Sequence, residues 1–311
     1  MPSKRVLLAW FDNEVVPASQ QFERRVEWLR ILPFIGMHLM CAGVIWVGVS
    51  STALLVAAAL YVLRLVAITG FYHRYFSHRT FRTSRAVQFV FAVLGTMAVQ
   101  RGPLWWAAHH RHHHAHADEE NDSHSPTQHG FWWSHFGWFM NRSNFRTRSE
   151  LVQDLTRYPE LRWLDRFDIV PPIALAAGLF FGGNALAQAY PQLATSGSQL
   201  LIWGFFISTV LLHHVTFTVN SLAHRFGRRR YATSDDSRNN WWIALLTFGE
   251  GWHNNHHHFP GSVRQGFYWW EIDLTYYLLR AMAACGLVWD LKSVPARIRE
   301  ARQTRAGTLP S

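Results

Sequence analysis

Long uncharged stretches alternate with polar segments along this chain of 311 residues. The first stretch covers residues 31–50, which is long enough to cross a hydrocarbon layer of about 30 Å as one helix. The second, 52–69, follows after almost no loop and contains a single charge, Arg64. Residues 169–190 and 200–219 form two more such stretches. The pattern therefore predicts four transmembrane helices that form two hairpins.

The basic residues predict which side of the membrane each segment faces. Of the 30 Lys and Arg residues, 29 lie in residues 1–30, 70–168 and 224–311, and the remaining one is Arg64. The short loops within the two hairpins carry no charge. By the positive-inside tendency, both termini and the long central segment are expected in the cytoplasm. The formal net charge of +10 is thus a signal of topology, and no nucleic-acid partner is expected.

The two cytoplasmic segments, 70–168 and 224–295, are expected to fold as a helical cap. They are rich in Trp and Phe, unlike linkers, and Trp is common at the boundary between membrane and water. Apolar but short stretches at 86–99 and 241–248 indicate helices that lie on the membrane or re-enter it. The fold class predicted is an all-α integral membrane protein.

One membrane domain is expected over residues 1–295, followed by a basic tail over residues 296–311. Residues 1–30 mix both charge signs and lack an apolar core, so no cleavable signal peptide is expected. Cys41 and Cys285 are the only cysteines. Two thiols are too few for a disulfide scaffold, a four-thiolate zinc site or an iron–sulfur cluster.

Histidine is unusually frequent, with 19 residues, and three clusters lie in the cytoplasmic segments. They read HRYFSH at 73–78, HRHHH at 110–114 and HNNHH at 253–257. In the second and third clusters, histidines recur at i, i+3 and i+4 and share one face of a helix within about one turn. The first pair is spaced i, i+5, about 140° apart on an α-helix. That spacing indicates either two different metals or a helix that ends between the two histidines.

A metal site made mainly of imidazoles suits Fe, Zn, Cu or Ni, and the ligand type alone does not choose among them. About nine nitrogens are too many for one ion and indicate a pair. Asn220 and His224, four residues apart at the cytoplasmic end of the fourth stretch, would point the same way. Carboxylates near the clusters could orient the rings through hydrogen bonds. The candidates are Asp118, Glu119, Asp122, Glu250 and Asp273, and a solvated position in a loop is favoured for each of them except Glu250, which lies three residues before His253.

The histidine clusters, together with NSLAH at 220–224, resemble those of the membrane fatty-acyl desaturases, especially the stearoyl-CoA (delta-9) type. Flanking segments agree, namely DSHSPTQHGFWWSHFGW at 122–138, GEGWHNNHHHFP at 249–260 and GLVWDLKSVP at 286–295. The similarity covers about residues 30–295. It implies four transmembrane helices under a cytosolic helical cap that holds a di-iron site.

The resemblance also implies a set of ligands for two iron ions, nine of them histidines. The tenth residue is Asn220, which would contact one iron through water. The nine histidines are His73, His78, His110, His113, His114, His224, His253, His256 and His257. His109, His112 and His258 flank these positions or occupy a variable one, and they are left out of the set.

One departure from the family pattern affects the carrier of the acyl chain. Just ahead of the second cluster, the animal enzymes have a basic and an acidic residue on the side that meets coenzyme A, whereas this chain has Ala108 and His109. Acyl-CoA is still favoured, and a phospholipid-bound or protein-bound chain stays open. Arg101 is a weak candidate for phosphate contact, with anchoring at the membrane boundary favoured.

The expected reaction is the O₂-dependent introduction of a cis double bond into a saturated acyl chain, with delta-9 as the expected position. Two electrons would come from outside, because the sequence contains no flavin fingerprint and no haem-binding domain. The donor expected is a ferredoxin or cytochrome b5 with a reductase, docked on the basic cytoplasmic face.

Two alternatives remain open. A di-iron hydroxylase could use the same scaffold, and the element formed by Asn220 and His224 favours a desaturase over it. A metal transporter would place ligands near the middle of the membrane. Only His213 and His214 are expected inside a span, where helix packing or the outer shell of the site is the favoured role.

Overall fold

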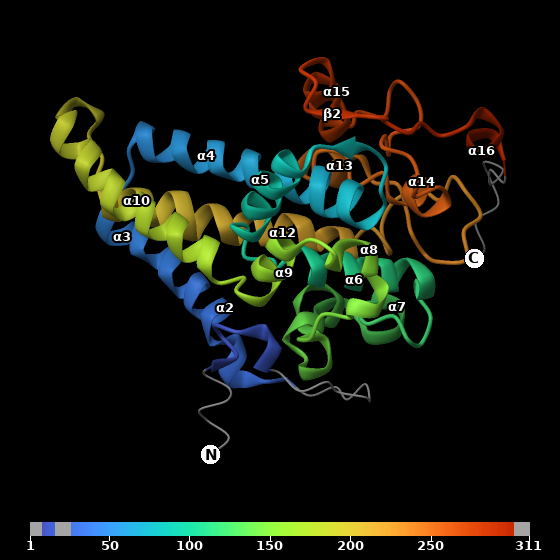
Figure 1. The fold of residues 1–311 in the computed structure, drawn as a ribbon, viewed down its shortest axis with the longest axis horizontal. Coiled ribbons are helices and arrows are strands. Elements are labelled where there is room, and N and C mark those ends of the chain that lie inside the picture. Colours follow the sequence, from blue (N-terminus) through green and yellow to red (C-terminus); the bar gives the residue numbers. More distant parts are fainter. Residues whose placement is uncertain (1–7, 16–25, 302–311) are drawn as a thin grey trace. The chain divides into compact units, whose positions relative to one another are not determined.

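A computed structural model describes residues 8–15 and 26–301 of the protein, most of which are helical (Figure 1). The chain forms two compact units, which are described separately. Among the described residues, the first unit draws on 8–15, 26–68, 89–106 and 139–214. The second unit draws on 69–88, 107–138 and 215–301. From residue 302 onward, the expected basic tail lies outside the described residues, and the limits of a single domain stay a prediction.

The described residues contain three helical runs that are long and apolar enough to cross a membrane, namely Ser51–Ser77, Val170–Ala189 and Gly197–Ser221. They correspond to the second, third and fourth predicted stretches. The first predicted stretch forms one helical run over Ile31–Val47, which includes a 3₁₀ turn at Cys41–Gly43 and is shorter than the other three. Gly48 then ends the helix in a left-handed conformation (φ +65°), which glycine adopts easily. A transmembrane helix at the first stretch, residues 31–50, therefore stays a prediction.

Most helices of the first unit are apolar, and local sequence determines where they begin. Pro171 and Pro172 occupy the first turn of α10, where their fixed φ angle suits a helix. Ser50 and Ser196 cap the N-termini of α4 and α11 by accepting hydrogen bonds from backbone N–H groups. The elements are α2 (Trp28–Met40), η2 (Cys41–Gly43), α3 (Val44–Val47), α4 (Ser51–Val66), α8 (Gln153–Thr156), α9 (Pro159–Arg166), α10 (Val170–Ala189), η8 (Pro191–Leu193), α11 (Gly197–Leu200) and η9 (Leu201–Ile207).

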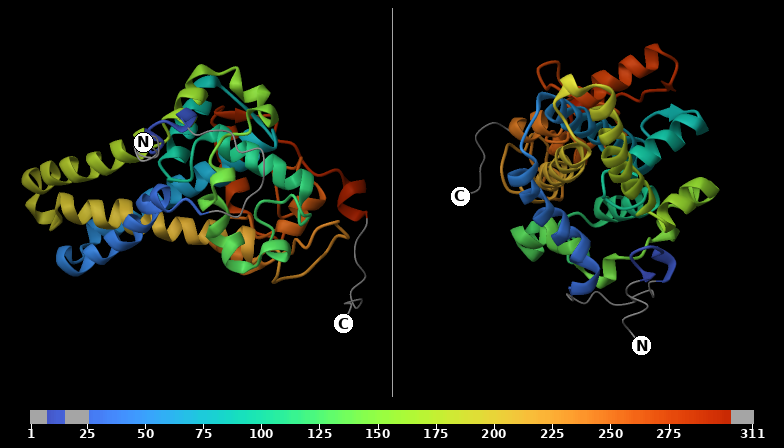
Figure 2. Two further views of the ribbon diagram at one scale, coloured as in Figure 1. Left: turned by 90° about the horizontal axis from the view of Figure 1, so that it is seen from below. Right: turned by 90° about the vertical axis from the view of Figure 1, so that its left-hand side faces the viewer.

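Close helix packing and one buried cation hold the first unit together. α10 lies against α11 and η9 (Figures 1 and 2), and a Cβ added at Gly183 would come within 2.8 Å of the Cα of Gly197. Small residues allow such an approach between membrane helices. Arg64 of α4 is fully buried and donates hydrogen bonds to backbone carbonyls and to Thr209 and Ser208. Its charge is therefore solvated by neutral oxygens inside the protein.

The second unit contains the histidine clusters. At four helices the chain passes from one unit to the other, so these helices have residues in both units. These four are η3 (Ala67–Ser77), α5 (Arg85–Thr96), α6 (Pro103–His116) and α12 (Ser208–Ser221). Its other helices are α7 (Pro126–His129), η4 (Trp133–Gly137), α13 (Trp241–Leu246), α14 (His253–His258), α15 (Leu274–Ala284) and α16 (Ala296–Glu300). β1 (Arg82–Thr83) and β2 (Val288–Trp289) pair antiparallel, so that Arg82 faces Trp289.

The widened helix η3 explains the i, i+5 spacing of the first cluster. Its backbone follows the π-helical pattern, in which the hydrogen bonds join residues five apart. The N–H of His78 accordingly donates to the carbonyl of His73 at 3.3 Å. The helix ends at Ser77, as one of the two interpretations of this spacing predicts. The two rings end up 5.0 Å apart between centroids.

Candidate metal centre

Five histidines converge in one group, with ligand nitrogens that all lie within 4.8 Å of one another. We call His73, His78, His110, His114 and His256 the five-histidine group. Their Nε2 atoms face each other, because His78 Nε2 lies 2.8 Å from His110 Nε2. His256 Nε2 lies 3.0 Å from that of His73 and 2.9 Å from that of His114. The group thus joins all three sequence clusters around one point.

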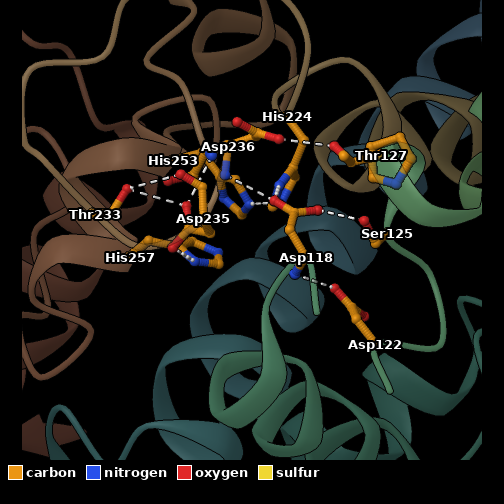
Figure 3. A network of polar contacts seen from close by, with 12 residues as sticks. Asp118, Asp122, Ser125, Thr127, His224, Thr233, Asp235, Asp236, His253 and His257 are labelled. Atoms are coloured by element: carbon orange, nitrogen blue, oxygen red, sulfur yellow. Dashed lines mark hydrogen bonds and ion pairs between the residues drawn. The ribbon is translucent and has the colours of Figure 1, made fainter. Parts of the chain in front are cut away.

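The remaining four histidines of the predicted set converge in a second group. We call His113, His224, His253 and His257 the four-histidine group. The Nε2 atoms of His224 and His253 lie 3.0 Å apart. Figure 3 shows His224, His253 and His257 of this group together with Asp118 and Asp235. All nine predicted histidines therefore belong to one of two groups, both within the second unit.

Helical spacing on α6 and α14 divides their histidines between the groups. On α6, His110 and His114 (i, i+4) belong to the five-histidine group, while His113 belongs to the other. On α14, His253 and His257 (i, i+4) belong to the four-histidine group, while His256 belongs to the five-histidine group. Each helix thus contributes to both groups, as expected if three imidazoles on one face reach two neighbouring ions.

The nitrogen positions fit a bound cation better than hydrogen bonds among imidazoles. Two nitrogens that bind one ion at about 2.1 Å and at right angles lie about 3 Å apart, close to the separations observed. A neutral imidazole has a single N–H, so the Nε2 of His256 cannot satisfy both His73 and His114. In addition, His257 Nε2 is buried without a hydrogen-bond partner. A metal ion in each group would satisfy these nitrogens.

Burial keeps most of these rings neutral, which leaves a lone pair free for a metal. Burial, reinforced by the neighbouring imidazoles, holds the pKa of five of them well below the usual histidine value. These five are His78, His110, His114, His253 and His256. Burial also lowers the pKa of His257, to about 4, although Asp235 partly opposes the shift.

Carboxylates hold the outer nitrogen of four rings, so that their Nε2 atoms point into the groups. The Nδ1–H of His73 donates to Glu250, and the contacts in the four-histidine group measure between 2.8 and 3.0 Å. There the pairs are His113 with Asp122, His224 with Asp118, and His257 with Asp235. Burial alone would lower the pKa of His113, but Asp122 outweighs it and the net shift is upward.

Of the five carboxylates proposed from the sequence, three orient histidines. Those three are Asp118, Asp122 and Glu250. The orienting role is confirmed for Glu250, and the solvated position favoured for Asp118 and Asp122 is wrong. It is also wrong for Asp273, which is buried, pairs with Arg74 at 2.9 Å and caps α15. Glu119 is exposed, as the solvated position predicts.

Two residues of the site have no signal in the sequence. Asp235 holds His257 at 3.0 Å but lies 22 residues away along the chain. Arg74 is buried and bridges Glu250 and Asp273, which links the partner of His73 to the segment before α15. Neither residue has a characteristic spacing from the histidines it supports, so only the folded structure reveals it.

The other predicted positions have mixed outcomes. The backbone carbonyl of Asn220 accepts a hydrogen bond from Ser134 Oγ at 2.8 Å, and a role of its side chain at a metal stays a prediction. α12 ends at Ser221, so His224 lies beyond the helix rather than on it. Outside both groups, His258 donates to the carbonyl of Ile298 and stacks on Tyr231.

The family model for fatty acid desaturases matches residues 26–289. The chain belongs to the fatty acid desaturase family. The match confirms the resemblance seen in the histidine clusters, and the matched residues include both groups of histidines.

Three relatives in the desaturase family illustrate its range. A "Probable lipid desaturase ADS3.2, chloroplastic" of Arabidopsis thaliana is 40% identical over 230 residues, 73% of this chain and 60% of the relative. An "Icosanoyl-CoA 5-desaturase" of Limnanthes douglasii is 38% identical over 232 residues, covering 73% and 61%. An "sn-1 stearoyl-lipid 9-desaturase" of Anabaena variabilis is 36% identical over 274 residues, covering 86% and 94%. The chain thus spans less than two thirds of the two plant relatives.

Proposed function

We propose that the protein is an O₂-dependent fatty-acyl desaturase that introduces a cis double bond into a saturated acyl chain. The observation that carries the proposal is the convergence of nine histidines into a group of five and a group of four with facing Nε2 atoms. We assign these histidines and Asn220 as ligands of two iron ions. Family membership supports the assignment, because the relatives are named as desaturases.

An iron pair would supply the electron transfer that activates O₂, so that O₂ can serve as the oxidant that removes two hydrogens from adjacent methylenes. The balanced reaction converts –CH₂–CH₂–, O₂, two electrons and two protons into –CH=CH– and two waters. The protein keeps most of the imidazoles neutral by burial and fixes the orientation of four of them through carboxylates. Burial of the ligand atoms also keeps bulk water away from the reacting methylenes. An external ferredoxin or cytochrome b5 with a reductase would supply the electrons.

For the substrate, we propose acyl-CoA desaturated at the delta-9 position, on the likeness of the histidine clusters to the stearoyl-CoA type. A lipid-bound acyl chain is the second candidate. Two observations favour it, namely the lipid substrates in the names of the Arabidopsis and Anabaena relatives and the presence of Ala108 and His109 at the coenzyme A side. The name of the Limnanthes relative gives CoA as the carrier and 5 as the position of the double bond. The carrier and the position are therefore tested separately.

Gas chromatography of fatty acids from a host that expresses the protein tests the reaction. We expect new monounsaturated acyl chains in air and none without oxygen. Membranes supplied with stearoyl-CoA or with stearoyl phospholipid then distinguish the carriers, and the double-bond position follows from mass spectrometry of a derivative. Hydroxylated chains in place of alkenes would show the hydroxylase reaction instead.

A metal transporter is the other candidate retained from the sequence, and contacts within the first unit argue against it. His213 donates from Nε2 to the carbonyl of Ala98 at 2.9 Å, and His214 contacts His38 at 3.1 Å. A chain of metal ligands along a span would need more such groups. Metal uptake into vesicles that contain the purified protein, without change in acyl chains, would favour transport.

A further inference from the structure

The two groups of histidines differ in the charge that surrounds them. Three of the four rings in the four-histidine group contact an aspartate, and in the five-histidine group His73 contacts Glu250. We call Asp118, Asp122 and Asp235 the three aspartates. They come from two segments of the second unit and contact rings of the four-histidine group (Figure 3).

Further hydrogen bonds fix the positions of the three aspartates. Asp118 accepts from Ser125 Oγ at 2.5 Å and from the backbone N–H of Asp236 at 2.8 Å. Asp122 accepts from the backbone N–H of Asp118 at 3.0 Å. Asp235 accepts from the backbone N–H of Ser237 at 2.8 Å.

No cation offsets these charges within the described residues, where none of the three aspartates forms an ion pair with Lys or Arg. Glu250, the carboxylate of the five-histidine group, pairs with Arg74 at 3.0 Å. Asp118 and Asp235 are close enough to have ligand atoms within 4.8 Å of each other and of His224. The negative charge is therefore concentrated on one side of the pair of groups.

We propose that the three aspartates make the two metal positions unequal, by strengthening metal binding in the four-histidine group and not in the five-histidine group. This inference rests on the proposed role of the nine histidines as ligands. A carboxylate that accepts the outer N–H of an imidazole makes the ring a stronger ligand, and its loss weakens metal affinity about 10–100-fold. Buried negative charge also attracts a divalent cation more strongly than it would in water.

Site-selective loss of metal tests the proposal. Full-length protein is loaded with Fe²⁺ without oxygen and titrated with a chelator, and bound iron per chain is measured by mass spectrometry. Asp122→Asn and Asp235→Asn keep the side-chain shape and remove the charge. In each variant we expect one ion to be released at about 10–100-fold lower chelator concentration and the other at the wild-type concentration.

Combined variants identify which ion is weakened. Adding His253→Ala to Asp122→Asn should leave the strongly held ion in place, whereas adding His110→Ala should weaken that ion as well. Glu119→Gln is the matched control, because Glu119 is a nearby exposed carboxylate without a histidine contact in the described chain, and it should leave both ions unchanged. Glu250→Gln should weaken the ion of the five-histidine group.

Equal weakening of both ions by Asp122→Asn and Asp235→Asn, or no weakening of either, would overturn the proposal. An ion held at wild-type strength shows that a variant is folded, so misfolding cannot imitate the expected result. The proposed function fails separately, if the wild-type protein binds two ions and yet forms no alkene in the host.

Discussion

Histidines close together on α6 have different surroundings. His110 Nε2 lies 2.8 Å from His78 Nε2 within the five-histidine group. His112, two residues further on, stacks on His116 and lies outside both groups. Removal of the ring at position 110 therefore deletes a proposed ligand, whereas removal at position 112 deletes a ring contact away from the metal positions.

His110→Ala is expected to abolish alkene formation and to weaken one of two bound iron ions at least tenfold. His112→Ala on the same helix is expected to keep both alkene formation and iron. Gas chromatography of host fatty acids and metal analysis of the purified proteins check these outcomes. Full desaturation by His110→Ala would contradict the ligand assignment.

For single residues, spacing in the sequence predicts which histidines come together but not which of the two groups each histidine joins. The i, i+3, i+4 pattern places His110, His113 and His114 on one face, yet it does not show that His113 belongs to a different group. The division depends on where α14 lies, which is a tertiary feature. Asp235 was missed for a related reason, because a hydrogen-bond partner need not have any fixed separation along the chain.

At the scale of elements, a buried carboxylate connects the start of α6 to α9. Asp165 accepts hydrogen bonds from the backbone N–H of Trp105 at 2.7 Å and from Thr147 Oγ1 at 2.6 Å. Burial raises its pKa to about 6, although these bonds partly oppose the shift. The native pKa therefore lies above the unfolded value of 3.8, so this carboxyl stabilises the fold most at low pH, and the benefit is lost as the pH rises through 6.

Asp165→Asn is accordingly expected to raise the melting temperature at pH 8 and to change it little at pH 4. The loss of stability that the charged carboxylate causes is of the order of 2–3 kcal/mol. Asparagine can still accept from Trp105 and can donate to Thr147, so the local bonds are kept. Thermal unfolding in detergent at both pH values measures the effect, and a lower melting temperature at pH 8 would refute it.

Two neighbouring glycines on α10 allow the effect of close helix packing on stability to be measured separately from the effect of helix propensity. A Cβ at Gly183 would lie 2.8 Å from the Cα of Gly197, whereas a Cβ at Gly182 would meet nothing within 4 Å. Gly183→Ala is thus expected to push α10 from α11 and lower the melting temperature by several degrees. Gly182→Ala should leave it equal or slightly higher, because alanine favours a helix by about 1 kcal/mol over glycine. Equal melting temperatures for the two variants would show that α10 and α11 are not closely packed at Gly183.

For the whole molecule, hydropathy predicts where the long helices lie better than where they end. The run Ser51–Ser77 extends eight residues beyond the predicted stretch, because its last turns carry polar side chains that the protein buries. Thr69, His73 and Arg74 are each at most 3% exposed. Hydropathy averaged over a stretch of sequence cannot distinguish polar residues buried in protein from polar residues in water. In the first stretch, the helix ends at Val47, where Gly48 adopts a positive φ, three residues before the uncharged stretch ends at residue 50.

The orientation in the membrane is the prediction that concerns the whole chain. From the distribution of basic residues, we predict that the termini and the histidine groups lie in the cytoplasm and the loop 191–198 outside. Cys285 and Gln192 are exposed in the structure and represent the two sides. In Cys41→Ser protein, a membrane-impermeant maleimide should label Cys285 after permeabilisation of the cells and not before. In a cysteine-free protein, the Gln192→Cys variant should be labelled in intact cells. The opposite pattern would place the histidine groups on the other side, away from a cytoplasmic electron donor.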